Sequence, residues 1–281
     1  MAAVRLIRGA RYRVLFLCSY LLTSLHTAYW EVMPAKPTWP PRSVPRLFVS
    51  GEIYQQLVLT LDKQQAHYLS NVMRVSHGDT IILCDNISGE WTGKVTSVAK
   101  RRVTIMIGEK LRNREEPPDL WICPALLKKD RFDLLLEKVT ELGVAEIHPV
   151  ITRRCVARKL NIERASSIVT EAAEQCRRTA LPYINPPRSL TTLIERWPQG
   201  RTIFFADEQG GEPAIDAFLT SRGPSALLIG PEGGFDNSER ELIIANCNTK
   251  RISLGPRIVR GETAAIAAIA LWMSTSGDWK N

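Results

Sequence analysis

The sequence predicts an α/β protein whose larger domain contains a parallel sheet, with a small β-rich domain ahead of it. From residue 120 onward, short continuous apolar runs alternate with segments of helical periodicity, as in sheets that carry helices on both faces. Two of these runs, residues 226–229 and 251–254, each end in a Gly-Pro pair. A series of short strand-like runs between residues 46 and 108 indicates a separate small barrel.

The larger domain is expected over residues 119–281. Its strands are predicted at residues 120–126, 147–151, 201–206, 226–229 and 251–254. Its helices are predicted at residues 130–142, 161–180, 213–219 and 236–245, with a final alanine-rich helix from residue 264. Asp130 is expected to cap the first helix, and Asp236 with Glu239 has the spacing of a capping box.

The smaller domain is expected over residues 46–110. Its strands are predicted at residues 47–49, 80–84, 91–99 and 103–107, and its one helix at residues 62–75 with Asp62 as N-cap. The stretch at residues 111–119 is charged, contains prolines and is poor in apolar residues. It therefore predicts the boundary between the two domains.

Residues 1–45 differ from the rest of the chain and are expected to be an extension. Four arginines, at positions 5, 8, 11 and 13, precede a mainly apolar run at residues 14–25. The run is shorter than the roughly 20 residues of a membrane span. Its order is that of a secretory signal, but nothing downstream suits an exported protein. A disordered extension or a mis-annotated start ahead of Met33 is favoured, which predicts a cytoplasmic protein with no membrane association.

The composition narrows the possible chemistry. A formal charge of +8 and a pI of about 9.3 suit a polyanionic partner, or simply a basic surface. None of the six cysteines forms a CxxC pair, which suits reduced thiols. No histidine follows His148, so the C-terminal half has neither a histidine base nor a His/Cys zinc site, and no metal is expected. The dinucleotide and P-loop fingerprints are also absent from the sequence.

Two glycine-containing loops form the candidate ligand site. Residues 230–234 and 255–261 each follow one of the Gly-Pro strands, at the sheet edge where α/β proteins bind ligands. One such loop would be an ordinary tight turn, but two together predict a pocket in which backbone approaches a nucleotide-like cofactor. The predicted cofactor-binding residues are Ile229, Gly230, Pro231, Glu232, Gly233, Gly234, Leu254, Gly255, Ile258 and Val259.

Five ordered sequence blocks carry a resemblance to a known family. They are EKVTELG at residues 137–143, RCVAR at 154–158, EQCRR at 174–178, IGPEGGF at 229–235 and SLGPRIVRGETA at 253–264. At this spacing, within a stretch from residue 46 to residue 279, they resemble the small-subunit (16S) ribosomal RNA uridine-N3 methyltransferases. That family, RsmE, belongs to the SPOUT superfamily.

The resemblance implies a SPOUT-type sheet with a C-terminal trefoil knot and a PUA-like RNA-binding barrel at residues 46–110. It also implies S-adenosyl-L-methionine as cofactor, 16S rRNA of the small ribosomal subunit as partner, and a homodimer. The last helix with Trp272 and Trp279 is expected to contribute to the dimer. Gly261 departs from the family pattern, which has a larger polar residue there, and this change would allow a looser loop.

Methylation of uracil N3 requires that the nitrogen lose its proton. With no histidine available, Glu262 is the candidate base, and Arg260 or Arg257 the candidate stabiliser of the uracil anion. Glu262 has an alternative role, because an acidic residue at a helix N-terminus is favoured by the helix dipole. The arginines expected to contact RNA are Arg74, Arg154, Arg158, Arg177, Arg178 and Arg257. Two alternatives stay open: a SPOUT enzyme acting on tRNA or a ribose oxygen, and a non-catalytic RNA-binding ribosome assembly factor.

Overall fold

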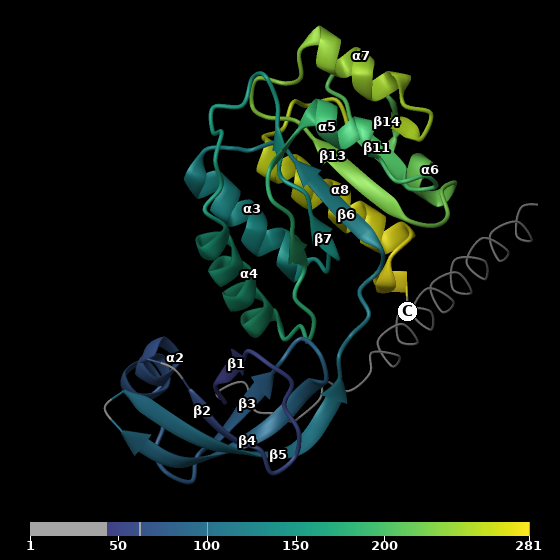
Figure 1. Cartoon of the computed structure of the whole chain (residues 1–281). Helices are drawn as coiled ribbons and strands as arrows, with labels where there is room; N and C mark the ends of the chain where they lie inside the picture. The colour runs from purple at the N-terminus through teal and green to yellow at the C-terminus, as the bar shows by residue number, and fades with distance from the viewer. Residues whose placement is uncertain (1–43, 62, 100, 281) are drawn as a thin grey trace, which may run out of the picture. The chain divides into compact units, whose positions relative to one another are not determined.

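A computed structural model describes residues 44–61, 63–99 and 101–280. The predictions for the extension at residues 1–43 and for the cap at Asp62 lie outside these residues. The described chain contains two main sheets, one from strands β1–β5 and one from strands of the C-terminal two thirds (Figure 1).

The first sheet has five strands in the order β1-β3-β4-β5-β2. The strands are β1 (Arg46–Phe48), β2 (Val58–Leu61), β3 (Thr80–Cys84), β4 (Gly89–Ala99) and β5 (Arg102–Asn113). β1 pairs with β3 in parallel and the other pairs are antiparallel. Ile81, Leu83, Val95 and Ile105 form its core. The four predicted strands are confirmed, β2 was missed, and closure into a barrel stays a prediction because β1 and β2 end the strand order.

Two boundaries in this domain differ from the prediction. The predicted helix at residues 62–75 is shorter: α2 (Lys63–His67) continues as a π-helical turn, η1 (Tyr68–Val72). Strand β5 also runs three residues into the predicted boundary segment. The reason is that Arg112 pairs with Glu90 of β4, both in the strand register and as an ion pair. A charged stretch therefore extends the β-ladder instead of ending it.

The second sheet is parallel and has seven strands in the order β12-β14-β11-β13-β6-β7-β9. The strands are β6 (Leu120–Pro124), β7 (Glu146–Ile147), β9 (Tyr183–Ile184), β11 (Thr202–Ala206), β12 (Glu212–Pro213), β13 (Ser225–Ile229) and β14 (Thr249–Ser253). The predicted parallel sheet is confirmed. The two strands that precede the glycine loops are not neighbours, because β11 lies between β13 and β14.

The predicted strand at residues 147–151 is two strands. Its first part is β7, and its second part, β8 (Val150–Ile151), pairs with β10 (Arg188–Ser189) in a separate two-stranded sheet. Pro149 stands between the two parts. A proline has no N–H to donate to a sheet ladder, so an interruption at this residue is the expected result.

Helices cover both faces of the second sheet (Figure 1). They are α3 (Lys129–Glu141), α4 (Ile162–Cys176), α5 (Leu190–Glu195), α6 (Ala214–Leu219), α7 (Asn237–Ala245) and α8 (Gly261–Thr275), followed by η2 (Asp278–Lys280). Residues of α3, α4, α6 and α8 pack with Phe204 and Leu227 in one core. Residues of α5 and α7 pack with Phe205 and Leu228 in another. The two-sided arrangement predicted from the alternating pattern is therefore confirmed.

Several predicted helix details are revised. The capping box of Asp236 and Glu239 is confirmed. The N-cap of α3 is Lys128, and Asp130 lies in the first turn. Helix α4 ends at Cys176, four residues earlier than predicted, because Arg177 adopts a left-handed conformation. The prediction that Trp272 is available for a dimer is wrong. Its side chain is 4% exposed, because it lies on the face of α8 that packs into the core.

No helix in the described ranges combines the length and the apolar character that crossing a membrane would require.

Candidate active site

The first glycine loop follows β13 and folds into a tight turn. Gly234 donates its backbone N–H to the carbonyl of Pro231 at 2.9 Å, and its φ is +67°. A side chain on Gly234 would also overlap the carboxylate of Glu208. The positive φ is the reason for a glycine here, since the Glu208 carboxylate is the exposed end of a flexible side chain that can move aside.

The second glycine loop follows β14 and is open to solvent. All six residues from Gly255 to Arg260 are exposed, and Ile258 is 92% exposed. Within the described residues, neither Arg257 nor Arg260 has a hydrogen bond or ion pair from its side chain. This loop therefore presents two free guanidinium groups and an exposed apolar side chain.

The start of α8 lies against the first loop. A Cβ on Gly261 would stand 3.1 Å from the carbonyl oxygen of Gly230 and 3.1 Å from a methyl group of Leu127. The predicted juxtaposition of the two loops is therefore present in the fold, although their strands are not adjacent. The missing side chain of Gly261 permits this close backbone approach, and a looser second loop stays a prediction.

Glu262 follows immediately and is buried, with 7% of its surface exposed. Its Oε1 lies 4.0 Å from Nε of Arg131. Its Oε2 is buried and has no hydrogen-bond partner among the described residues. A buried carboxylate oxygen without a partner is unusual, since such groups are normally satisfied. The site therefore holds an acceptor that a bound molecule can satisfy.

Arg131 is the site residue that sequence reasoning missed. It lies in the first turn of α3, and its Nη1 is 3.3 Å from Oε1 of Glu232 in the first loop. It thus stands between a carboxylate of the first loop and the carboxylate of Glu262 at the start of α8. The available signal was a basic residue in the first turn of a helix, where the helix dipole disfavours positive charge.

The segment after β8 packs along the first loop. Arg154 donates from Nη1 to the carbonyl of Gly233 at 2.8 Å, and Arg153 pairs with Asp236 at 2.8 Å. The backbone N–H of Glu239, together with Arg153, lowers the pKa of Asp236 to about 2. Arg158 donates to the carbonyl of Arg153 at 3.1 Å. Arg153, Arg154 and Arg158 are exposed, so their guanidinium groups border the site.

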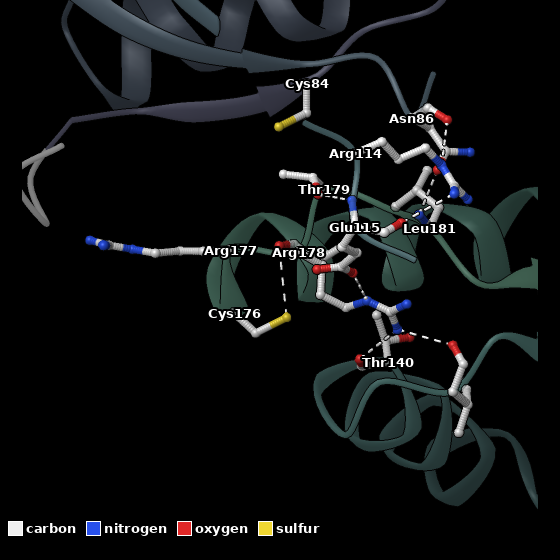
Figure 2. A network of polar contacts seen from close by, with 12 residues as sticks. Cys84, Asn86, Arg114, Glu115, Thr140, Cys176, Arg177, Arg178, Thr179 and Leu181 are labelled. Atoms are coloured by element: carbon white, nitrogen blue, oxygen red, sulfur yellow. Dashed lines mark hydrogen bonds and ion pairs between the residues drawn. The ribbon is translucent and has the colours of Figure 1, made fainter. Parts of the chain in front are cut away.

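The EQCRR block is different, as Figure 2 shows. Arg178 is 5% exposed, and its Nη1 donates to the carbonyls of Thr140 at 3.0 Å and Val144 at 3.1 Å. Its Nε pairs with Glu115 at 2.8 Å. The predicted RNA contact of Arg178 is therefore corrected: the side chain donates to the carbonyl of Thr140 in the last turn of α3, which also accepts the N–H of Gly143, and to that of Val144 just beyond the helix.

The neighbouring Arg177 and the distant Arg74 are accessible. Arg177 turns its carbonyl toward Arg46 and Arg112, which both donate to it, while its side chain extends away from this network (Figure 2). Arg74 is exposed on the turn after η1. It belongs to the first sheet's domain and is not brought into the loop pair by any described contact. Within the described residues no group of His, Cys, Asp and Glu side chains suits a metal ion.

Family comparisons agree with this arrangement. Residues 114–273 match the model of the RNA methyltransferase domain, and residues 61–107 match that of the RNA methyltransferase PUA domain. The fold and the loop pair thus define a protein of the RNA methyltransferase class, with a parallel sheet like that of SPOUT methyltransferases and a PUA-like N-terminal domain.

Relatives narrow the class. "Ribosomal RNA small subunit methyltransferase E" of Rickettsia conorii is 32% identical over 230 residues, covering 80% of this chain and 93% of that protein. The protein of the same name from Bacillus subtilis is 32% identical over 78% of this chain and 91% of its own length. The chain belongs to the ribosomal RNA small subunit methyltransferase E family. A structure of the Neisseria gonorrhoeae member bound to S-adenosyl methionine has a TM-score of 0.76 and 28% identity, covering 84% of this chain and 99% of that one.

Proposed function

We propose that this protein transfers a methyl group from S-adenosylmethionine to N3 of a uridine in 16S rRNA. The observation that carries the proposal is the meeting of the two glycine loops in a chain of this family, with Gly261 against Gly230. Relatives are named as small-subunit rRNA methyltransferases, and one is crystallised with the methyl donor. The N3 position is supported by the sequence resemblance and by Glu262 as a suitable base.

The loop pair fits the cofactor on this chain's own geometry. Gly230 and Gly261 let the backbone of the two segments pack closely, and Gly255 has no atom within 4 Å of where a Cβ would stand, so its backbone is open to a ligand. Oε2 of Glu262 is a buried acceptor without a partner among the described residues. The residues that would hold the cofactor are Ile229, Gly230, Pro231, Glu232, Gly233, Gly234, Leu254, Gly255, Ile258 and Val259. When bound, S-adenosylmethionine supplies an electrophilic methyl group on its sulfonium.

The chain's own residues would prepare the uracil for this transfer. Glu262 accepts the N3 proton at Oε2, which has no competing partner among the described residues. Arg260, with Arg257 near it in the chain, donates to the uracil carbonyl oxygens as the negative charge develops on them. An arginine can do this at neutral pH because it keeps its proton. The burial of Glu262 keeps bulk water away from this carboxylate.

RNA would lie along exposed arginines. The candidates are the exposed Arg74, Arg154, Arg158 and Arg257, with the half-buried Arg177. Each phosphate contact adds about −0.9 to the slope of log affinity against log salt on a duplex, and less on a single strand. The PUA-like domain would contribute Arg74. The number of contacts is therefore measurable from the salt dependence of RNA binding in filter or fluorescence assays.

A homodimer, a trefoil knot and a cytoplasmic location complete the proposal. The exposed Ile258 and the 52% exposed Trp279 are apolar surfaces for a second copy, in place of the buried Trp272. The knot is supported by the family and by the approach of the start of α8 to the first loop. Light scattering of the purified protein tests the dimer, with a monomer mass as the contradicting result.

The function is tested with 30S subunits or 16S rRNA from cells that lack the gene. Labelled methyl transfer followed by nucleoside analysis should give N3-methyluridine. A ribose-methylated nucleoside, or transfer to tRNA only, would replace the proposal with another SPOUT activity. Failure of the protein to bind S-adenosylmethionine in calorimetry would instead favour a non-catalytic assembly factor.

A further inference from the structure

Three charged side chains from three separate elements meet at the edge of the loop pair. Arg131 comes from α3, Glu232 from the loop after β13, and Glu262 from the start of α8. Arg131 reaches Glu232 through Nη1 at 3.3 Å and Glu262 through Nε at 4.0 Å. One guanidinium group thus connects the first loop with the element that ends the second.

The local sequence of α3 does not account for an arginine at this position. Positive charge in the first turn of a helix opposes the helix dipole and lowers the stability of the helix. Asp130 offsets part of this cost, but the N-cap Lys128 contributes no side-chain cap. The arginine is therefore better explained by its contacts with the two carboxylates than by the stability of its own helix.

The two carboxylates need a cation between them. Glu232 and Glu262 both approach the same guanidinium group, so without it two negative charges would face each other across the loops. The Glu262 side chain is only 10% exposed, which limits the screening of such repulsion by water. Arg131 offsets the repulsion and lies 4.0 Å from Oε1 of Glu262, an ion pair without a hydrogen bond, while Oε2 remains without a partner in the described chain.

We propose that Arg131 is a positioning residue: it holds the first glycine loop against the start of α8 and orients the Glu262 carboxylate, acting through Glu232 and Glu262. The inference rests on the proposed function for its consequence, because the held loop is the cofactor segment and the oriented oxygen is the proton acceptor. Arg131 itself is not required to touch the substrate.

The first test compares Arg131→Gln, Arg131→Lys, Glu232→Gln and the double variant R131Q/E232Q. Arg131→Gln should weaken S-adenosylmethionine binding about three- to tenfold in calorimetry. Arg131→Lys should recover most of the loss because it restores the charge. The double variant should bind no more weakly than Arg131→Gln alone, since both changes remove the same contact. Unchanged or tighter binding by Arg131→Gln would overturn the inference, because tighter binding is what a cation that merely repels the sulfonium predicts.

Arg164→Gln is the matched control. Arg164 of α4 pairs with Asp133 of α3 at 2.7 Å, with its side chain 50% exposed, and touches neither loop in the described structure. It should leave cofactor binding unchanged. A loss of affinity equal to that of Arg131→Gln would show a general effect of helix charge and reject a specific role for Arg131.

A second measurement separates this inference from the proposed function. Hydrogen exchange of residues 230–235 without any ligand should be faster in Arg131→Gln than in the wild type, and unchanged in Arg164→Gln. Equal exchange in Arg131→Gln and wild type would overturn the inference even if the enzyme methylates rRNA. A wild-type protein that neither binds the cofactor nor methylates RNA would defeat the proposed function, while the exchange result still decides the role of Arg131.

Discussion

Two arginines from the family's sequence blocks have opposite surroundings. Arg178 is buried, and its donors are directed at two backbone carbonyls and Glu115 (Figure 2). Arg260 is exposed and has no partner in the described chain. Hydrogen-bond donors that are already paired within the protein stabilise the fold, whereas unpaired donors are available to a ligand. The comparison teaches that the role of an arginine in a family motif depends on whether the folded protein already pairs its donors.

The largest effect is expected on the rate of methylation, from substitution of Glu262. Glu262→Gln should lower kcat by about 10²–10⁴, because the amide cannot accept the N3 proton. The unfolding free energy should hold or rise, since the substitution removes a buried charge whose Oε2 is unpaired. Single-turnover methylation and urea denaturation measure the two quantities. A near-normal rate would assign Glu262 to the helix dipole alone.

Truncation of the saturated arginine should act on stability. Arg178→Ala is expected to lower the unfolding free energy by about 3 kcal/mol, because it removes the guanidinium donor to the carbonyls of Thr140 and Val144 and opens a cavity. Chemical denaturation at fixed pH measures the change. At a temperature where the variant is folded, kcat should stay within about twofold of the wild type. A large loss of kcat with intact stability would restore Arg178 as an RNA contact.

The same truncation at the free arginine should act on rate. Arg260→Ala should reduce kcat by about 10²–10³, the usual loss when a donor to a developing oxyanion is removed. Its unfolding free energy should change by less than about 0.5 kcal/mol, as at other exposed positions. Arg257 lies three residues earlier in the same loop. Comparison with Arg257→Ala would decide which guanidinium group contacts the substrate. If Arg260→Ala were fully active, Arg257 would take the role.

The smallest effect is expected in the pH dependence of stability that Glu174 of α4 causes. The Glu174 carboxylate accepts the backbone N–H of Phe48 at 2.7 Å, and burial raises its pKa to about 7. The folded state then binds more protons than the unfolded state between the ordinary pKa of 4.5 and about 7, so stability is higher below this window and falls as pH rises through it. Glu174→Gln keeps a carbonyl acceptor and should flatten the profile between about pH 5 and 7 in thermal unfolding. A profile of unchanged slope would contradict the assignment.

The sequence was informative where periodicity or capping chemistry decides the outcome. The alternation from residue 120 onward predicted the parallel sheet with helices on both faces, and the spacing of Asp236 and Glu239 predicted their capping box. Both are local or periodic properties, so neighbouring residues carry enough information. The ion pair of Arg112 with Glu90 shows the limit, because a partner 22 residues away extended β5 through a segment that reads as a linker.

The candidate site was predicted in part for a similar reason. Glycine loops after apolar runs are visible in a sequence, and so is an acid at the start of a helix. The contacts of Arg131 with Glu232 and Glu262 depend on how α3, β13 and α8 pack, and no local pattern encodes that. Nor could the sequence tell Arg178 from Arg177, since the difference arises from the left-handed turn at Arg177.

The order of strands in the second sheet has a consequence for synthesis of the chain. β13 joins β6 to β11, and it follows β6 by about 105 residues, from Leu120 to Ser225. At roughly 5–20 residues per second, a translating ribosome needs about 5–20 s to add that length. During this interval β6 can pair with β7 but not with β13, so one edge of this apolar strand stays unpaired and the core of the sheet is incomplete. We therefore expect nascent chains stalled before residue 225 to bind chaperones and to be cut by proteases at sites that the finished protein protects.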